Sequence, residues 1–439
     1  MPKDSLSLPA VASTAPIASS RTPNARIAQP RVPLTRPLRH RRYRQLWLAN
    51  LVSNLGTWTQ TFASAWLIAS LSDSAMLSAL VQTASYVPFL LFALFAGVIA
   101  DAVHRPRFLF FCTLFMALCA AAMALLVAGG QASPGPLLLL TFCLGSGSAF
   151  MWPAWQAAMC GLMDPDEVES AATLNNLSYN ATAIAGPALG GVLFAWIGPG
   201  ALFFVNALSF IGLLAAYRAW WREETPPASQ RGVARCIACR GDFLASLKLG
   251  VATALGCPRY RRILRHVCTV FFATIAFAAL LPVFVRDVLH LHSGVFGILM
   301  GSLGGGAVLG ALFLPGLRTR IDKTSLLAYS LLVYGIMLVA MPWLESLLLL
   351  VPLIVAGGMA WSATVSTMNA AAQLAFPQHI RARTLSIYLF VMAGGYTAGS
   401  LVWGQLADAL GVQAAMCIAG ACVILNAVLL ATGKAENAI

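Results

Sequence analysis

Long apolar stretches alternate with short polar segments along almost the whole chain. Each stretch holds about 20 residues, which as a helix is enough to cross roughly 30 Å of hydrocarbon. The pattern predicts an all-α polytopic membrane protein with twelve transmembrane helices. The expected spans are residues 46–71, 75–100, 107–128, 136–160, 171–196, 200–221, 263–286, 294–317, 325–343, 347–374, 384–408 and 412–432.

Composition and charge agree with a membrane location. The chain is 59% hydrophobic and 10% charged, whereas a soluble domain is about 25% charged. All but one of its 28 Lys and Arg residues fall before the first span, between the sixth and the seventh, in alternate loops or in the C-terminal tail; Arg286 is the exception. Flanking basic residues stay in the cytoplasm. We therefore expect a multi-pass protein of the cell inner (plasma) membrane with both termini cytoplasmic. The net charge of +13 then reflects topology, and no nucleic acid is expected as a partner.

The spans divide the chain into two halves. Residues 46–221 form an expected N-terminal six-helix half and residues 263–432 a C-terminal one, joined by a cytoplasmic linker at 222–262. Residues 1–45 are rich in Pro, Ser and Arg and lack the apolar core of a signal peptide, so they are expected to be a disordered basic cytoplasmic arm. Residues 433–439 are a cytoplasmic tail. The linker holds a CxxC pair, Cys236 and Cys239, but no further ligand set, and neither a metal nor a cofactor is predicted.

Short motifs recur between the halves. Arg42-Tyr43-Arg44 before the first span returns as Arg259-Tyr260-Arg261 before the seventh, roughly 215 residues further on. Because each half holds six spans, the two units share one orientation. The spacing predicts two parallel repeats with a solute site between them near the middle of the membrane.

Polar and aromatic side chains mark the expected solute path. The first and fifth spans each carry amides and hydroxyls at helical spacing, so that these side chains share one face. Such groups face other helices or a wet cavity. For a single residue, cavity lining and interhelical hydrogen bonding remain equal alternatives, and only the stripe as a whole favours a cavity. The substrate-path candidates are Asn50, Asn54, Thr57, Trp58, Thr61, Asn176, Tyr179, Asn180, Trp361 and Tyr388.

Ionisable groups are confined to the ends of the expected spans. Asp101 ends the second span, and Arg105 follows in a tight loop. An anion there can pair with the arginine and with the N-terminus of a neighbouring helix, which predicts a gating contact formed by Gly97, Asp101 and Arg105. Ordinary loop charge is the alternative. No G-x-x-x-x-G-K-[ST] motif is present, so we expect no enzyme and no nucleotide hydrolysis.

The fifth span contains Gly186-Pro187 followed by Gly190-Gly191. Proline removes one helix hydrogen bond, and glycines permit close backbone approach. A bend or a tight helix crossing is predicted here.

Over residues 40–432 the chain resembles the major facilitator superfamily. Gly97, Asp101 and Arg105 resemble its signature between spans two and three, although Ala102 and His104 depart from it. The segment from Gly186 to Gly191 resembles the fifth-span signature of its proton-driven exporters. The arginine that these exporters carry in the fourth span is replaced by Thr141.

Tyr43-Arg44 and the segment Ser53-Asn54-Leu55-Gly56-Thr57-Trp58 resemble the branch that contains the transmembrane secretion effectors. The resemblance implies a secondary active transporter that exports a small organic solute (a siderophore, drug or amphipathic metabolite) by alternating access, an antiporter coupled to protons. Its partners would be that solute, protons and the lipid bilayer. A solute importer of the same fold and a non-transporting membrane scaffold or sensor are the alternatives.

Overall fold

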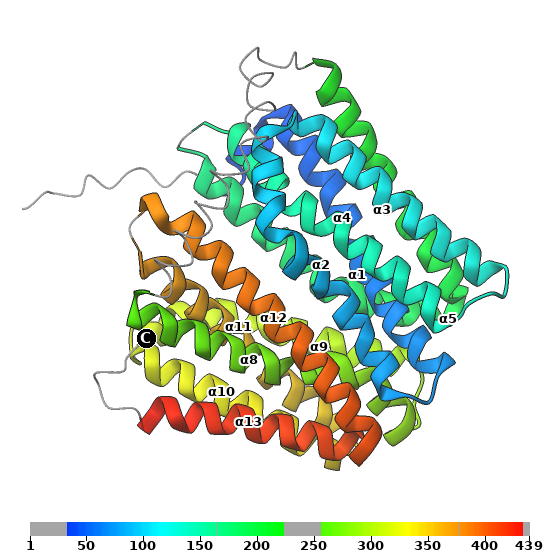
Figure 1. Ribbon diagram of the computed structural model, residues 1–439, viewed down its shortest axis with the longest axis vertical. Helices are drawn as coiled ribbons and strands as arrows, with labels where there is room; N and C mark the ends of the chain where they lie inside the picture. The colour runs from blue at the N-terminus through cyan, green and yellow to red at the C-terminus, as the bar shows by residue number, and fades with distance from the viewer. Residues whose placement is uncertain (1–32, 165, 224–255, 377, 433–439) are drawn as a thin grey trace, which may run out of the picture.

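The computed structural model describes residues 33–164, 166–223, 256–376 and 378–432, apart from the side chains of residues 93–94, 97–98, 100–102, 160 and 378–383. Within these ranges the chain is helical and contains no strand. Eleven long α-helices carry the fold (Figure 1). They are α1 (Arg41–Leu71), α2 (Ala75–Ala102), α3 (Arg105–Ala128), α4 (Pro134–Gly161), α5 (Val168–Glu223), α8 (Pro258–Val283), α9 (Ser293–Arg318), α10 (Lys323–Ala340), α11 (Leu347–Leu374), α12 (Gln378–Leu410) and α13 (Val412–Thr432).

The longest helix, α5, is two spans joined at a sharp break. Gly198 has φ 77° and ψ 170°, a conformation outside the helical region. Glycine adopts positive φ without steric cost, and the following Pro199 is suited to the first turn of a new helix. Counting α5 twice, the described chain crosses the bundle twelve times, as the apolar pattern predicts.

Ten of the described helices, α5 counted once, are long and apolar enough to cross a membrane. The helix α1 is not among them because its polar stripe, which includes Asn50, Asn54 and Gln60, lowers its hydropathy. Its position inside the bundle explains why it can carry those side chains, since neighbouring helices and not lipid surround them.

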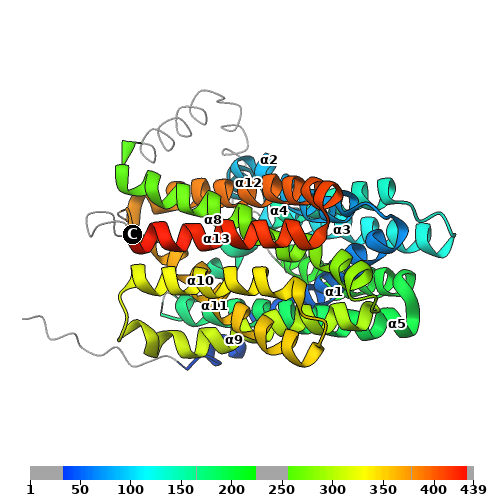
Figure 2. The same cartoon turned by 90° about the horizontal axis from the view of Figure 1, so that it is seen from below.

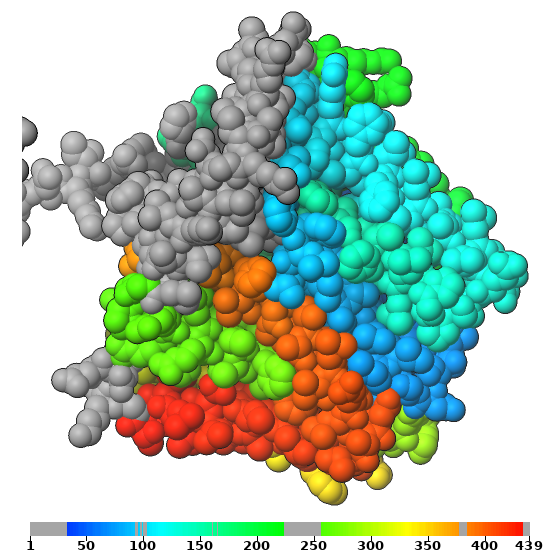
Figure 3. Space-filling model, viewed as in Figure 1, coloured from blue at the N-terminus to red at the C-terminus, as the bar shows by residue number. Residues whose placement is uncertain are grey.

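The helices form two groups that lie side by side (Figures 1 and 2). Helices α1 to α5 pack against one another, and so do α8 to α13. The groups meet mainly where α2 packs on α12 and α5 packs on α9, and the contact between α2 and α12 follows the boundary seen in Figure 3.

The two ends of the bundle differ in charge. We call the end that carries Arg42, Arg105, Arg259 and Arg318 the basic end, and the opposite one the Asp408 end. Because the number of crossings is even, α1 begins and α13 finishes at the basic end. The two groups converge toward the Asp408 end and diverge toward the basic end (Figure 1).

A duplicated tyrosine contact supports the internal repeat. The Tyr43 hydroxyl on α1 donates to the carbonyl of Ala171, in the first turn of α5, at 3.0 Å. The Tyr260 hydroxyl on α8 donates to the carbonyl of Thr384, near the start of α12, at 2.5 Å. Both tyrosines are fully buried. The motif that recurs in the sequence thus makes the same contact in each half.

Helical structure begins earlier than the expected arm allows. A 3-10 turn, η1, spans Arg36–Arg39, and α1 starts at Arg41. The expected disordered arm, residues 1–45, is therefore too long at its C-terminal end, because an ion pair from Arg36 to the start of α5 holds this turn in place. Residues 1–32, most of the linker with Cys236 and Cys239, and the tail lie outside the described residues.

Candidate functional site

Aromatic rings gather where the two groups of helices meet. In the first group Tyr179 of α5 lies between Trp58 of α1 and Trp152 of α4, with ring centroids 5.8 Å and 5.5 Å away. Both pairs are edge-to-face, the arrangement that aromatic quadrupoles favour. All three rings are partly exposed although they lie near the middle of their helices. Tyr179 and Trp58 were predicted for the solute path.

The second group contributes a matching set of rings. Phe271 of α8 packs edge-to-face against both Trp361 of α11, at 5.5 Å, and Tyr396 of α12, at 5.0 Å. Tyr334 of α10 lies 5.7 Å from Trp361. Tyr396 also stacks on Tyr86 of α2, with centroids 4.4 Å apart. This stack joins the two groups of helices.

The two sets form one cluster. Tyr179 lies near both Tyr86 and Tyr396. We call these eight rings the central aromatic cluster. Its members are Trp58, Tyr86, Trp152, Tyr179, Phe271, Tyr334, Trp361 and Tyr396.

The predicted stripe on α1 is only partly open. Asn54, Thr57 and Thr61 are half-buried. The hydroxyls of Thr57 and Thr61 each donate to the carbonyl four residues earlier, at 2.9 Å, so their hydrogen-bonding needs are already met within the helix. Asn50 is buried and does not reach an open path in this conformation.

The amides on α5 are open. Asn176 and Asn180 are exposed. They share a helical face with Ile184 and Ala188, which lie against Gly304 and Gly301 of α9. Asn180 and Asn176 lie one and two turns beyond Ile184 toward the basic end, where the two groups of helices diverge (Figure 1).

Tyr388, also predicted for the solute path, lies inside the second group. It is 1% exposed, and its hydroxyl has no hydrogen-bond partner among the described residues. Tyr388 is therefore enclosed by its own half and does not face the region between the two groups of helices. Trp361, by contrast, is half-buried and belongs to the central aromatic cluster.

The glycines of the fifth span hold α1 on one side and α9 on the other. Gly186 lies against Trp58 and Thr59, and the Thr59 hydroxyl donates to the Gly186 carbonyl at 3.3 Å. Gly190 lies against the ring of Phe62. Gly191 faces Gly297 so closely that a Cβ on Gly191 would lie 2.9 Å from the Gly297 Cα. Apart from Gly198, the backbone of α5 stays helical, so Pro187 accompanies a tight crossing and not a sharp kink.

Hydrogen bonds close the bundle at the Asp408 end. The carboxylate of Asp408, at the end of α12, accepts from the backbone N–H of Ala75 at 2.6 Å and from the Ser74 hydroxyl at 2.7 Å. The Met76 N–H donates to it as well, at 3.3 Å. These groups are the N-terminus of α2, where a carboxylate is favoured by unpaired N–H groups and the helix dipole. Asp408 therefore acts as a helix cap supplied by the opposite half of the protein.

A second contact joins the halves at the same end. Arg286, the one basic residue that the charge pattern leaves on this side, donates to the carbonyl of Ser72 at 2.7 Å. It also lies 3.7 Å from the carboxylate of Asp73 and pairs with its neighbour Asp287. With Asp408 and the crossing of Gly191 on Gly297, these contacts seal the Asp408 end.

The predicted gating residues lie at the basic end. Gly97 and Asp101 fall on the last turns of α2, but their side chains lie outside the described part of the structure. Arg105 begins α3 beside the end of α4, with its guanidinium near Gly161. A gating contact by Asp101 and Arg105 remains a prediction.

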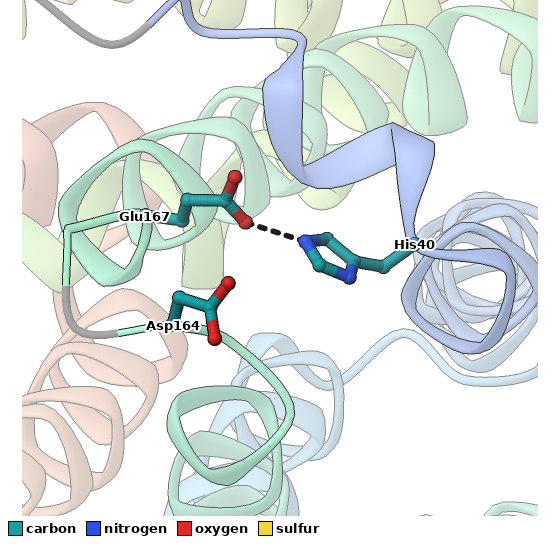
Figure 4. A group of neighbouring side chains, drawn as sticks. All are labelled: His40, Asp164 and Glu167. Carbon is teal, nitrogen blue, oxygen red and sulfur yellow. Dashed lines mark hydrogen bonds and ion pairs between the residues drawn. The ribbon is translucent and has the colours of Figure 1, made fainter.

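A buried carboxylate ties the N-terminal segment to α5 at the basic end. Glu167 accepts from Arg36 Nε through one oxygen, at 2.6 Å, and lies 2.6 Å from His40 Nε2 through the other. Asp164 lies beside them (Figure 4). His40, Asp164 and Glu167 are close enough to share a metal ion. Since both oxygens of Glu167 are already engaged, the arrangement is better explained as an ion-pair network.

Removing this carboxylate is expected to destabilise the protein. Glu167→Ala should lower the free energy of unfolding by about 2 kcal/mol, because two charge-assisted hydrogen bonds are lost at a buried position. Denaturant unfolding of the detergent-solubilised protein measures the change. Asp166→Ala is the matched control. Asp166 also pairs with Arg36, but at 3.4 Å, and its side chain is 57% exposed. Equal effects of the two variants would contradict this role for Glu167.

Comparison with known proteins identifies the family. The model of the transmembrane secretion effector family matches residues 33–437. The chain belongs to this family. The transmembrane secretion effector fold is that of the major facilitator superfamily, which confirms the resemblance seen in the sequence.

Two curated relatives of this chain are transporters. The multidrug efflux pump Tap of Mycobacterium tuberculosis is 24% identical over 379 residues, which cover 83% of this chain and 87% of the relative. The staphyloferrin A transporter of Staphylococcus aureus is 24% identical over 371 residues, covering 83% and 89%.

Solved structures share the fold of this chain at low identity. A bacterial homolog of the human lysosomal transporter Spinster, in an inward-facing and occupied conformation, has a TM-score of 0.69 and 15% identity. The matched region covers 92% of this chain and 99% of that one. The nucleoside transporter NupG has a TM-score of 0.67, at 13% identity over 89% of this chain and 98% of that one.

Several residues of the candidate site were not predicted from the sequence. Tyr86, Phe271 and Tyr334 sit within apolar stretches and read as ordinary core residues. Asp408 reads as a charge at the end of a span. A comparison of the two halves would not have found Tyr86, because the offset of 217 residues between Arg42 and Arg259 relates Tyr396 to Tyr179 and Tyr86 to Leu303.

Proposed function

We propose that this protein is a secondary active transporter that exports a small organic solute from the cytoplasm by alternating access, coupled to the proton gradient. The observation that carries the proposal is the arrangement of the two halves. They are sealed at the Asp408 end by Asp408, Arg286 and the crossing of Gly191 on Gly297. They stand apart at the basic end, where Asn176 and Asn180 are exposed. The names of the two curated relatives support export of a drug or siderophore.

The charge distribution supports an orientation of the protein in the membrane. Basic residues flanking membrane spans are retained in the cytoplasm, which would place the basic end and both termini inside the cell, in the inner membrane. The conformation would then be inward-facing and ready to receive a solute from the cytoplasm. Export requires the seal at the Asp408 end to open while the basic end closes, and the pairs α2 with α12 and α5 with α9 are the surfaces that must change.

Accumulation assays test the proposal. Cells that lack their own efflux pumps would express the protein and be exposed to dyes, antibiotics and catecholate siderophores, with and without a protonophore. We expect lower accumulation of at least one compound class, and the protonophore should restore it. The control is the same cells expressing Gly297→Val, a variant expected to transport at least tenfold more slowly because its side chain would clash with the backbone of α5. Raised accumulation would support an importer, and no difference from this control across the panel would contradict export.

The gating contact at the basic end gives a separate prediction. Asp101→Asn should leave expression intact and slow turnover about tenfold, since a charge-assisted hydrogen bond to a gate would be lost. The control is Asp322→Asn. Asp322 caps α10, the Ser325 N–H donates to it at 3.0 Å, and this bond lowers the pKa of its carboxyl. Asparagine caps a helix equally well, so this control should keep its rate. Unchanged transport by Asp101→Asn would remove Asp101 from the mechanism.

A further inference from the structure

The central aromatic cluster lies where an exported solute must pass, yet no formal charge accompanies it. Between their ends the spans of this sequence contain no Asp, Glu, Lys or Arg. The charged residues of the described helices lie within about two turns of a helix end, as Asp408, Arg105 and Arg265 do. The groups that can bind a solute in the middle of the bundle are therefore aromatic rings, hydroxyls and amides.

This composition disfavours anions. A carboxylate that leaves water must find a cation or several strong donors, because an unpaired charge in a low-dielectric site is costly. The cluster offers tyrosine hydroxyls and indole N–H groups but no guanidinium or ammonium group. The carboxylates of a polycarboxylate ligand would find no cationic partner at this position.

The same composition favours a diffuse cation. The faces of Trp and Tyr rings carry negative electrostatic potential and attract positive charge, most strongly when that charge is already poorly hydrated. Trp58, Trp152 and Tyr179 are partly exposed on one side of the cluster, and Trp361, Tyr396 and Tyr86 are partly exposed on the other. A planar ligand between these two sets would meet ring faces or edges from both halves. A charge spread over an aromatic system fits better than a compact ammonium group, which loses more hydration and finds no carboxylate here.

We infer that the solute bound by the central aromatic cluster is a planar aromatic compound with one delocalised positive charge, and not a polycarboxylate. The inference rests on the proposed function for its location, since it takes the space between the halves to be the transport path. The choice of a cationic over an anionic solute rests on the chemistry of the cluster alone.

The test compares two probes that differ in one group. A rhodamine ethyl ester is a delocalised cation, and in the corresponding free acid a carboxylate replaces the ester, so that the same ring system becomes a zwitterion. Binding to the purified protein in detergent is measured by fluorescence titration. We expect the ester to bind at least tenfold more tightly than the acid. Equal or tighter binding of the acid, or no binding of the ester, would overturn the inference.

Substitutions then locate the site. Tyr179→Leu removes the ring between Trp58 and Trp152 and should weaken ester binding about tenfold, whereas Tyr179→Phe keeps the ring and should retain most of the affinity. Trp221→Leu is the control for loss of a ring elsewhere, because Trp221 packs under Arg107 at the basic end, 4.7 Å from its guanidinium. Equal losses for Tyr179→Leu and Trp221→Leu would overturn the assignment to the cluster.

Failure of the inference and failure of the proposed function can be told apart. If the ester binds selectively at Tyr179 but cells do not export it or any other compound, the chemistry of the site stands and export fails. If cells export a polycarboxylate and the purified protein binds it in place of the ester, export stands and the inferred solute class fails.

Discussion

Gly297→Val is expected to lower transport at least tenfold while the protein still folds and inserts. A Cβ at position 297 would lie 2.9 Å from both the Gly191 Cα and the Pro187 carbonyl oxygen of α5, and valine adds two further methyl groups. Backbone atoms cannot rotate away as a side chain can, so α5 and α9 must separate. Overpacking of this kind costs about 1–3 kcal/mol. That cost falls only on the conformation sealed at the Asp408 end, and the sealed population drops accordingly.

A glycine on the same helix provides the control. A Cβ at Gly305 would meet no atom within 4 Å, so Gly305→Val changes helix propensity to the same degree without creating a clash. We expect Gly305→Val to transport at a rate close to that of the unmodified protein. Solute efflux normalised to the amount of protein in the membrane measures both variants. Equal rates for Gly297→Val and Gly305→Val would show that the crossing of α5 on α9 does not limit transport.

Asp408→Ala is expected to shift the protein toward a conformation open at the Asp408 end. The substitution removes the acceptor for the Ala75 and Met76 N–H groups and for the Ser74 hydroxyl, all of which belong to the other half. Charge-assisted hydrogen bonds contribute about 1.5–3 kcal/mol, which corresponds to a change of roughly 10-fold to 100-fold in the balance of the two conformations. Asp408→Asn retains an acceptor oxygen and should give an intermediate shift.

Distances between the halves measure the shift. Spin labels at Gln131 and Ser346, which are exposed in loops of the two halves at the Asp408 end, would report their separation once the native cysteines are replaced. Asp408→Ala should populate longer distances. Glu345→Ala, which alters a carboxylate in a loop at the same end, should leave the distribution unchanged. A distribution for Asp408→Ala that matches the unmodified protein would contradict a sealing role for Asp408.

The sequence predicts the fold of this chain well because hydropathy acts locally. A helix in lipid satisfies its own backbone, so the apolar stretches alone mark the spans, and Gly198-Pro199 marks the break that divides α5. The repeated Arg-Tyr-Arg motif predicts the parallel halves, and Tyr43 and Tyr260 make equivalent contacts. The start of α1 is missed because its first turns are polar and are held by an ion pair to Glu167, which the sequence places 131 positions after Arg36.

The site is predicted less well because it depends on how the halves dock. The spacing of Asn176 and Asn180 identifies a polar face, but only their exposure in the folded chain shows that no neighbouring helix covers it. Tyr388 and Tyr396 lie on one helix and look alike in the sequence, yet one is buried in its own half and the other stacks on Tyr86 across the interface. The contact of Asp408 with Ala75 joins residues 333 positions apart, and no local pattern encodes it.

Transport in proteoliposomes tests the central claim most directly. Purified protein would be reconstituted with the compound that shows the largest difference in the accumulation assay, and a pH gradient would be imposed across the membrane without nucleotide. The account predicts uphill movement of the compound that requires the gradient, stops when a protonophore dissipates it, and is lost in Gly297→Val but not in Gly305→Val. Movement that ignores the gradient would contradict proton coupling, and equal movement in protein-free liposomes would contradict transport by this protein altogether.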